Sequence, residues 1–421
     1  MKHFLTILLC ILVLVSMVAC STTQPSAPLA KGGDGVIKGK RSEDVNAHDG
    51  IYYSAKGELA EACDDIVPAP GPGPAAHSGI QPGAGTMTGA ELRDILDMNE
   101  WRKGFDDQRK TWAINRGLDS ETAIDVYVMN GNIPIYNCPV TLCDNQGNTV
   151  YEARTDVFGC AILCCSAKEY SKRMTIKVDG EVKAEGIDIM SMTSFGINDG
   201  AKGTELKELD LMLMVDTTGS MGDELDYLKA ELVDIVERVS EGNEMLSVRT
   251  SVNFYRDETD EYIVKYYDFR DDIQEAVELI KQQEANGGGD FPEAVHTALD
   301  NAVNTHVWRE NAVKLCFFVL DAPPHTEDEV QGVTASLRKS IKTAAAKGIK
   351  IIPVAASGID EETEFILRSF AVMTGGTYIF ITDDSGVGES HLVPDIQDYK
   401  VEPLNECIIR VIDQYCGIQY T

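Results

Sequence analysis

The chain has 421 residues, which at roughly 100–200 residues per domain indicates two or three domains. Apolar residues make up 43% and charged residues 25%, and these ordinary globular values exclude a chain that is disordered throughout. The formal net charge is −31, and such an excess of carboxylates repels phosphate. Nucleic acids and anionic membrane surfaces are therefore excluded as the main partners, whereas divalent cations and basic proteins fit the charge.

The first twenty residues predict an export signal with a lipid-attachment site. Lys2 and His3 precede an almost wholly apolar stretch from Phe4 to Ala19, which is shorter than the about 20 residues of a membrane-spanning helix. Residues 1–19 are typical of a secretory signal peptide. The stretch ends Met-Val-Ala-Cys20, which resembles a bacterial lipobox and implies that Cys20 is diacylated. We expect a lipid-anchored protein of the cell envelope, outside the cytoplasm and attached to the plasma or outer membrane; a simple signal peptide cleaved near Ala19 is the alternative.

Two segments of different composition follow the leader. Residues 20–87 are rich in Gly, Pro, Ala and Ser and show no apolar period, which predicts a flexible, disordered tether. Residues 88–120 regain a helical pattern and predict a short helical segment.

The sequence does not decide whether the cysteines form disulfides or remain thiols. Nine remain after Cys10 of the leader and Cys20, and an odd number cannot pair completely. Five of them fall within residues 138–165, but not at the paired C-x-x-C spacing of a zinc site. Cross-strand disulfides and buried thiols both remain compatible with the sequence.

Residues 121–199 predict a small all-β sandwich. Short alternating runs at 125–128, 139–142 and 149–153 are separated by turns such as Asn130-Gly131. The order Pro-Val-x-Leu, Gly-x-x-Val and Thr-Asp-x-x-Gly-x-Ala-x-Leu resembles carboxypeptidase-regulatory-like domains. That resemblance implies a transthyretin-like fold that serves as a spacer without catalytic residues.

Residues 205–418 alternate predicted strands and helices. Leu209–Val215 is a nearly continuous apolar run, as in strands that helices cover on both faces, and a stripe from Leu225 to Val239 has the period of a helix. We expect further elements at 247–255 and 261–269 (a hairpin), 271–285, 292–304, 314–320, 334–347, 350–356, 361–374, 377–381 and 403–416. This order predicts a doubly wound, Rossmann-like α/β domain with its ligand site at the carboxyl ends of the strands.

Oxygen-bearing side chains follow these strand ends. Asp216, Thr218 and Ser220 alternate after the first strand, Asp321 follows the strand at 314–320, and a glycine-rich loop between them carries Asp290. Oxygen ligands without thiolate or imidazole favour Mg²⁺, Mn²⁺ or Ca²⁺. Taken singly, Ser220 with Asp223 and Asp290 with Glu293 also match helix caps.

The same residues resemble the von Willebrand factor type A domain and its metal-ion-dependent adhesion site. Asp216, Thr218 and Ser220 match the motif Asp-x-Ser/Thr-x-Ser, and Asp321 matches the Asp after the fourth strand. Asp290 stands where the family has Thr, and the resemblance covers residues 208–416. It implies a divalent cation, most often Mg²⁺, that binds a protein partner. With a third anionic ligand the site would bind the cation more tightly, but the cation would attract a carboxylate of the partner less. We therefore expect a structural metal or a neutral partner group.

An enzyme is the alternative function. The loop Asp-x-Thr-Gly-Ser also resembles that of Mg²⁺-dependent haloacid-dehalogenase-type phosphatases, in which Asp216 would be the nucleophile. The later loops at 287–294 and Asp321 would then be unexplained. No Ser-His-Asp or Cys-His arrangement and no phosphate-binding G-x-x-x-x-G-K-[ST] motif is evident, which argues against covalent hydrolysis and nucleotide binding. We expect a non-catalytic protein, acting either in adhesion or as a scaffold for envelope complexes.

Overall fold

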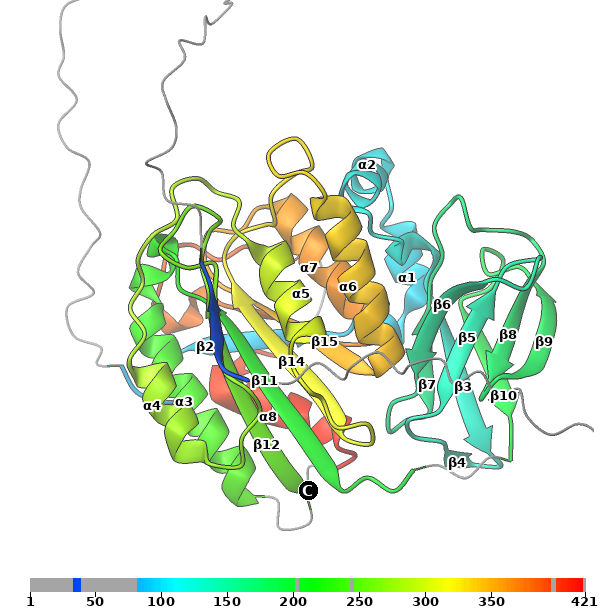
Figure 1. Cartoon of the computed structure of the whole chain (residues 1–421), viewed down its shortest axis with the longest axis horizontal. Helices are drawn as coiled ribbons and strands as arrows, with labels where there is room; N and C mark the ends of the chain where they lie inside the picture. The colour runs from blue at the N-terminus through cyan, green and yellow to red at the C-terminus, as the bar shows by residue number, and fades with distance from the viewer. Residues whose placement is uncertain (1–32, 39–81, 201–203, 243–245, 395–398, 419–421) are drawn as a thin grey trace, which may run out of the picture. The chain divides into compact units, whose positions relative to one another are not determined.

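A nine-stranded mixed sheet forms the centre of the molecule (Figure 1). The computed structural model describes residues 33–38, 82–200, 204–242, 246–394 and 399–418. Across the sheet the strands are β1 (Gly35–Ile37), β13 (Val264–Tyr266), β12 (Ser247–Tyr255), β11 (Glu208–Asp216), β14 (Val313–Leu320), β15 (Ile349–Ala355), β16 (Tyr378–Ile381), β2 (Thr88–Leu92) and β17 (Glu402–Pro403). The five strands from β12 to β16 run parallel, and antiparallel strands flank them on both sides.

Helices cover both faces of this sheet. The helices are α1 (Met98–Lys103), α2 (Asp107–Arg116), α3 (Leu225–Gly242), α4 (Ile273–Lys281), α5 (Val295–Asn304), α6 (Val333–Lys347), α7 (Glu361–Thr374) and α8 (Leu404–Tyr415). Alternate residues of β11 pack against α3, α4 and α8 on one face and against α5, α6 and α7 on the other (Figure 1). The predicted doubly wound α/β fold is confirmed.

Local sequence explains the main elements. Every residue of β11 from Leu209 to Asp216 is buried, as the nearly continuous apolar run predicts. Asp210, the one charged residue within that run, is paired with Arg249 and Arg309. The stripe on α3 points into the core at Leu228, Leu232 and Ile235, which have the spacing of one helical face. At α7, the Asp360 side chain accepts a hydrogen bond from the Thr363 amide at 2.7 Å and so fixes where the helix begins.

Two strands outside the parallel part of the sheet differ from the sequence-based expectation. Within the predicted tether, residues 35–37 form β1, which pairs with β13, and Asp34 forms an ion pair with Arg270. Residues 88–92, predicted as helical, form β2 between β16 and β17. Both corrections have one cause. These strands are only three and five residues long, and pairing with strands distant in the chain defines them, so their sequences show no alternation of apolar and polar residues that would predict a strand. Helices α1 and α2 follow β2.

Residues 124–198 form two four-stranded sheets. One contains β10 (Ser194–Asn198), β3 (Ile124–Asn130), β4 (Ile133–Pro134) and β7 (Cys160–Leu163), and the other contains β6 (Thr149–Arg154), β5 (Pro139–Cys143), β8 (Met174–Val178) and β9 (Glu181–Ile187). In β8, buried Met174, Ile176 and Val178 alternate with half-buried Thr175 and Lys177, the pattern of a strand with one face in a core.

The cysteines of the described residues are reduced and buried. All eight cysteines in the described ranges, from Cys138 to Cys416, are buried free thiols. The predicted signal peptide, Cys20 and the tether residues 20–32 and 39–81 lie outside the described residues. Among the helices that are described, none is long and apolar enough to cross a bilayer.

Candidate metal centre

Asp216 and Asp321 lie at the ends of two neighbouring strands. Asp216 is the last residue of β11, and Asp321 comes directly after β14. The two strands are parallel and adjacent, with Val215 opposite Val319, so both carboxylates emerge at the same edge of the sheet. This edge is formed by the carboxyl ends of the parallel strands, where α/β folds place their ligands.

Backbone hydrogen bonds join the other loops to this edge. The Asn286 amide donates to the Thr217 carbonyl at 3.0 Å, and the Gly219 amide donates to the Gly287 carbonyl at 3.2 Å. Farther along the same loop, the Glu293 amide donates to the Pro323 carbonyl at 2.9 Å. The glycine-rich loop is thereby held between the turn after β11 and the loop after β14.

The hydroxyls lie within hydrogen-bonding distance of the carboxylates. The backbone amide and the hydroxyl of Thr218 donate to Oδ1 of Asp216 at 2.8 and 2.7 Å. The hydroxyls of Thr218 and Ser220 lie 3.1 Å apart, and Ser220 donates to Asp321. Asp216, Thr218, Ser220 and Asp321, the four residues that match the family motif, are therefore joined by a continuous chain of contacts.

Several oxygens at this centre have no hydrogen-bond partner. They are Oδ2 of Asp216, Oδ1 of Asp321 and Oε2 of Glu293, and all three atoms are buried. A buried polar atom without a partner costs roughly 1–3 kcal/mol, and more when the group is charged. Unpaired carboxylate oxygens beside hydroxyls are a donor set that fits a cation.

The pKa values of the acids at this centre are raised, as expected for buried carboxyl groups that lie close together. Burial raises the pKa of Asp216 to about 6, against the hydrogen bonds from Thr218. Burial, together with the charge of Asp216, raises the pKa of Asp321 to about 8. Burial and the charges of Asp216 and Asp257 raise the pKa of Glu293 to about 10. A divalent cation would remove the cause of these shifts because it offsets both desolvation and mutual repulsion.

The donor set fits a hard divalent cation. Among the described residues, no three His, Cys, Asp or Glu side chains converge closely enough to hold a metal by themselves. A cation here would therefore be held by the two aspartates together with the hydroxyls of Thr218 and Ser220. Neutral and anionic oxygens are the ligands that Mg²⁺, Mn²⁺ and Ca²⁺ prefer.

Asp290 and Glu293, two acids of the same loop, differ in their exposure. The Asp290 side chain is exposed, whereas that of Glu293 is buried and only 2% exposed. Gly288, with φ +71°, lies between them and the hydroxyl loop: a Cβ there would meet Oε1 of Glu293 at 2.9 Å and Cβ of Thr218 at 3.5 Å. Whether Asp290 is a ligand stays a prediction. Glu293, which the sequence suggested only as a capping partner, is a buried acid beside this centre.

A second layer of side chains fixes these loops. His325, four residues after Asp321, lies with its Nε2 2.6 Å from Oδ1 of Asp257, and both are buried. Arg256 donates to the carbonyls of Thr217 at 3.1 Å and Glu284 at 2.9 Å. The turn after β12 thus connects all three ligand loops.

Comparisons with known proteins agree with this geometry. The family model described as "von Willebrand factor type A domain" matches residues 210–395. Over 186 residues the chain is 28% identical to the ariadne-like RING finger protein R811 of Acanthamoeba polyphaga mimivirus, covering 41% of this chain and 18% of that protein. Over 118 residues it is 27% identical to the alpha-protein kinase vwkA of Dictyostelium discoideum, covering 28% and 19%. The chain therefore spans less than a fifth of the length of either relative.

A solved structure was also found similar. The crystal structure of the conserved hypothetical protein BatB from Bacteroides thetaiotaomicron aligns with a TM-score of 0.34 and 13% identity, over 50% of this chain and 99% of that one. The family match itself spans β11, the glycine-rich loop and β14, the three segments that supply the site. Residues 210–395 are a von Willebrand factor type A domain.

Proposed function

We propose that this protein is a lipid-anchored, extracytoplasmic envelope protein that binds a protein partner through a divalent cation held by Asp216, Thr218, Ser220 and Asp321. A von Willebrand factor type A domain supports a role in protein interaction, as an adhesin or as a scaffold. A bound cation, most often Mg²⁺ with Mn²⁺ or Ca²⁺ as alternatives, would supply a positive charge and a coordination position for an oxygen of the partner.

One observation carries the metal dependence. Buried, unpartnered oxygens of Asp216 and Asp321 stand beside two hydroxyls at the edge of the sheet. Glu293 adds a further buried acid at that place, with its pKa raised to about 10. This crowding of acids favours a neutral oxygen of the partner over a carboxylate.

The surroundings of Asp216 support a non-catalytic role. Asp216 is 0% exposed, and its Oδ1 accepts two hydrogen bonds from Thr218. A nucleophilic carboxylate must reach the reacting atom of its substrate. Asp216 instead has the environment of a ligand to a small ion, and we propose no phosphatase activity.

The metal dependence is tested by a pull-down with the full chain as bait. Envelope proteins that bind in Mg²⁺ should be released by EDTA and recovered when Mg²⁺ is restored. Asp321→Asn should fail to capture them, while Asp144→Asn, which removes the charge of a half-buried carboxylate in a turn of the sandwich, should capture them as the wild type does. An identical set of bound proteins in Mg²⁺, in EDTA and with Asp321→Asn would contradict the proposal.

The lipid anchor needs a separate test. We expect labelled fatty acid to be incorporated into the wild-type chain and not into Cys20→Ser, and the wild type to fractionate with membranes. Equal labelling of both chains would show that Cys20 is not the acylated residue.

A further inference from the structure

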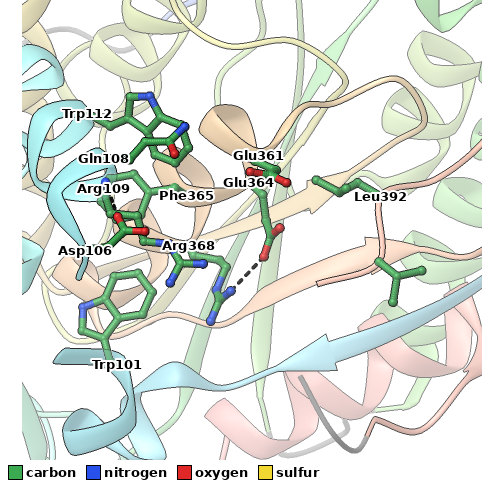
Figure 2. A pocket seen from close by; sticks show the side chains of 11 residues that line it. Trp101, Asp106, Gln108, Arg109, Trp112, Glu361, Glu364, Phe365, Arg368 and Leu392 are labelled. Atoms are coloured by element: carbon green, nitrogen blue, oxygen red, sulfur yellow. Dashed lines mark hydrogen bonds and ion pairs between the residues drawn. The ribbon is translucent and has the colours of Figure 1, made fainter. Parts of the chain in front are cut away.

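A second cavity, distinct from the metal centre, lies between α2 and the beginning of α7 (Figure 2). Its volume is about 210 Å³, below the about 300–1,000 Å³ of pockets that take whole small-molecule ligands. Three aromatic rings line it: Trp112 lies 5.8 Å and Trp101 6.2 Å from Phe365, centroid to centroid. Leu392 and Val393 complete the wall opposite α2. The size and the aromatic wall suit a single side chain.

The polar lining favours a positive charge. Arg368 is neutralised in place, since it donates to Asp94 at 2.9 and 2.6 Å and to Glu364 at 2.8 Å. Asp106 and Glu361 also line the cavity and are exposed, and the ion pairs found among the described residues involve neither. With Asp94 included, four carboxylates therefore face two guanidiniums, Arg109 and Arg368.

The two guanidinium groups that line the cavity have partners of their own: Arg368 lies over an aromatic ring, and Arg109 donates to a backbone carbonyl. Arg368 lies over the Trp101 ring with its guanidinium carbon 5.4 Å from the ring centroid, the geometry of a cation–π contact. Arg109 donates to the Gly104 carbonyl at 2.7 Å, at the end of α1. The ring of Trp112, by contrast, faces the cavity together with Glu361 and Gln108 (Figure 2).

Both sides of the cavity are tied to the loops of the metal centre. Arg116 at the end of α2 donates to Glu362 at 2.8 Å and to the carbonyl of His325, in the loop after Asp321, at 2.9 Å. On the other side, Nε2 of His391 lies 2.8 Å from Glu224, which follows the turn that carries Ser220. Leu392 and Val393 come directly after His391. The cavity is therefore held in fixed relation to the metal-binding loops.

We propose that this cavity is a second contact site on the metal-bearing face, and that it takes the guanidinium or ammonium group of an arginine or lysine side chain of the protein partner. Trp112 and Phe365 pack against the side chain, and Glu361 and Asp106 offset its charge. This inference rests on the proposed function, because it places a second anchor of the same partner beside the cation.

The test uses a probe that needs neither the partner nor the metal. N-acetyl-arginine amide is titrated into the full chain in EDTA while the indole N–H signals of the three tryptophans are followed by NMR. We expect saturable shifts at Trp112 and Trp101 and none at Trp308, whose indole is bonded to the Ala302 carbonyl at 2.9 Å. The uncharged isostere N-acetyl-citrulline amide should produce no saturable shift.

Matched variants separate the site from general electrostatics. Glu361→Gln should weaken the binding of the probe about two- to fivefold, the effect of one partly exposed charge. Asp107→Asn removes an exposed acid from the first turn of α2 that does not line the cavity, and should leave binding unchanged. No saturable shift at Trp112, equal binding of the citrulline analogue, or equal effects of the two variants would overturn the assignment.

Failure of this inference remains distinguishable from failure of the proposed function. The cavity contains none of the metal-centre residues, so the affinity for the probe should be the same in EDTA and in Mg²⁺. If EDTA abolished probe binding, the probe would be bound at the metal centre and the assignment would be overturned. Loss of the partner with Asp321→Asn tests the metal-dependent function alone.

Discussion

At the residue scale, the acids of the metal centre bind protons that they would lose in the unfolded chain. Burial raises the pKa of Asp321 to about 8 in the folded protein from an ordinary value of 3.8, and that of Glu293 to about 10 from 4.5. The folded chain therefore binds more protons than the unfolded chain between these values. In that range its stability must fall as the pH rises.

The first prediction concerns the fall of stability with rising pH. In EDTA, the free energy of unfolding should decrease steadily from about pH 5 to about pH 8, the range in which unfolded carboxylates are ionised while Asp321 and Glu293 are still protonated. Millimolar Mg²⁺ should restore the loss, and its stabilising effect should grow with pH because the cation replaces the protons. Calorimetric unfolding at several pH values checks this, and a melting temperature that rises across the range in EDTA would contradict it.

A second prediction separates Glu293 from Asp290. Glu293→Gln should raise the melting temperature in EDTA, because the buried acid must take up a proton on folding and the amide need not. It should weaken Mg²⁺ affinity about 10–100-fold, as changes beside metal ligands do. Asp290→Asn, at an exposed position three residues earlier, should change both quantities far less. Thermal shifts measured over a series of Mg²⁺ concentrations give both numbers. If Asp290→Asn had the larger effect on affinity, Asp290 would be the ligand.

At the scale of elements, the segment before the sandwich is part of the sheet domain. Strand β2 lies between β16 and β17, and a Cβ on Gly89 would meet Cδ1 of Leu404 at 2.9 Å. Beyond β2, the side chains of Asp94 and Arg368 are 9% and 13% exposed and joined by two hydrogen bonds. This buried pair connects the segment to α7.

The third prediction concerns that pair. Asp94→Ala should lower the free energy of unfolding by about 3–5 kcal/mol, since it leaves Arg368 buried with Glu364 as its remaining partner. Glu100→Ala, which breaks an exposed ion pair with Lys103 in the same segment, should cost no more than about 1 kcal/mol. Denaturant unfolding of both variants is the measurement, and equal costs would show that the Asp94 pair contributes no more than a surface contact.

Sequence patterns predicted the elements that carry their own period. The stripe of α3 and the apolar run of β11 have their buried faces where the pattern placed them, because each depends on neighbours within one element. The strands β1 and β2 were missed since pairing with β13 and β16, far along the chain, defines them. The helix predicted at 271–285 is shorter, Ile273–Lys281, because the chain turns there toward the glycine-rich loop.

The same distinction applies to the metal centre. Asp216, Thr218 and Ser220 lie on one short turn, and Asp321 directly follows a strand, so strand order alone brings them together. The position of Glu293 depends on the path of the glycine-rich loop and on its bond to Pro323. The one sequence signal for it was its spacing from Asp290, which is also that of a helix cap.

At the scale of the whole molecule, the described residues between 33 and 418 form one compact unit in which the sandwich and the sheet domain share a hydrophobic core. The Tyr151 side chain of β6 is buried, and its hydroxyl donates to the Met373 carbonyl of α7 at 2.6 Å. Lys342 of α6 donates to Glu169 at 3.0 Å. The sandwich is therefore anchored on the face formed by α6 and α7.

The fourth prediction tests this anchoring. The sandwich and the sheet domain should unfold in a single transition, and Tyr151→Phe should lower the free energy of unfolding by about 1–3 kcal/mol because it leaves the Met373 carbonyl unpaired. Tyr170→Phe, which removes a hydroxyl bonded to Asp188 within the sandwich, serves as the control for the loss of a hydroxyl. Two separate calorimetric transitions in the wild type would show that the domains are not anchored to each other.

The central claim is that one divalent cation binds where the loops after β11 and β14 meet the glycine-rich loop, and titration calorimetry in buffers of different ionisation enthalpy tests it most directly. At pH 7 the pKa values of Asp321 and Glu293, about 8 and about 10, keep both acids protonated without metal. We predict saturable binding of one Mg²⁺ or Mn²⁺ per chain with release of at least one proton, and loss of that binding in Asp321→Asn. No saturable binding, or the same binding and proton release in Asp321→Asn, would contradict the account.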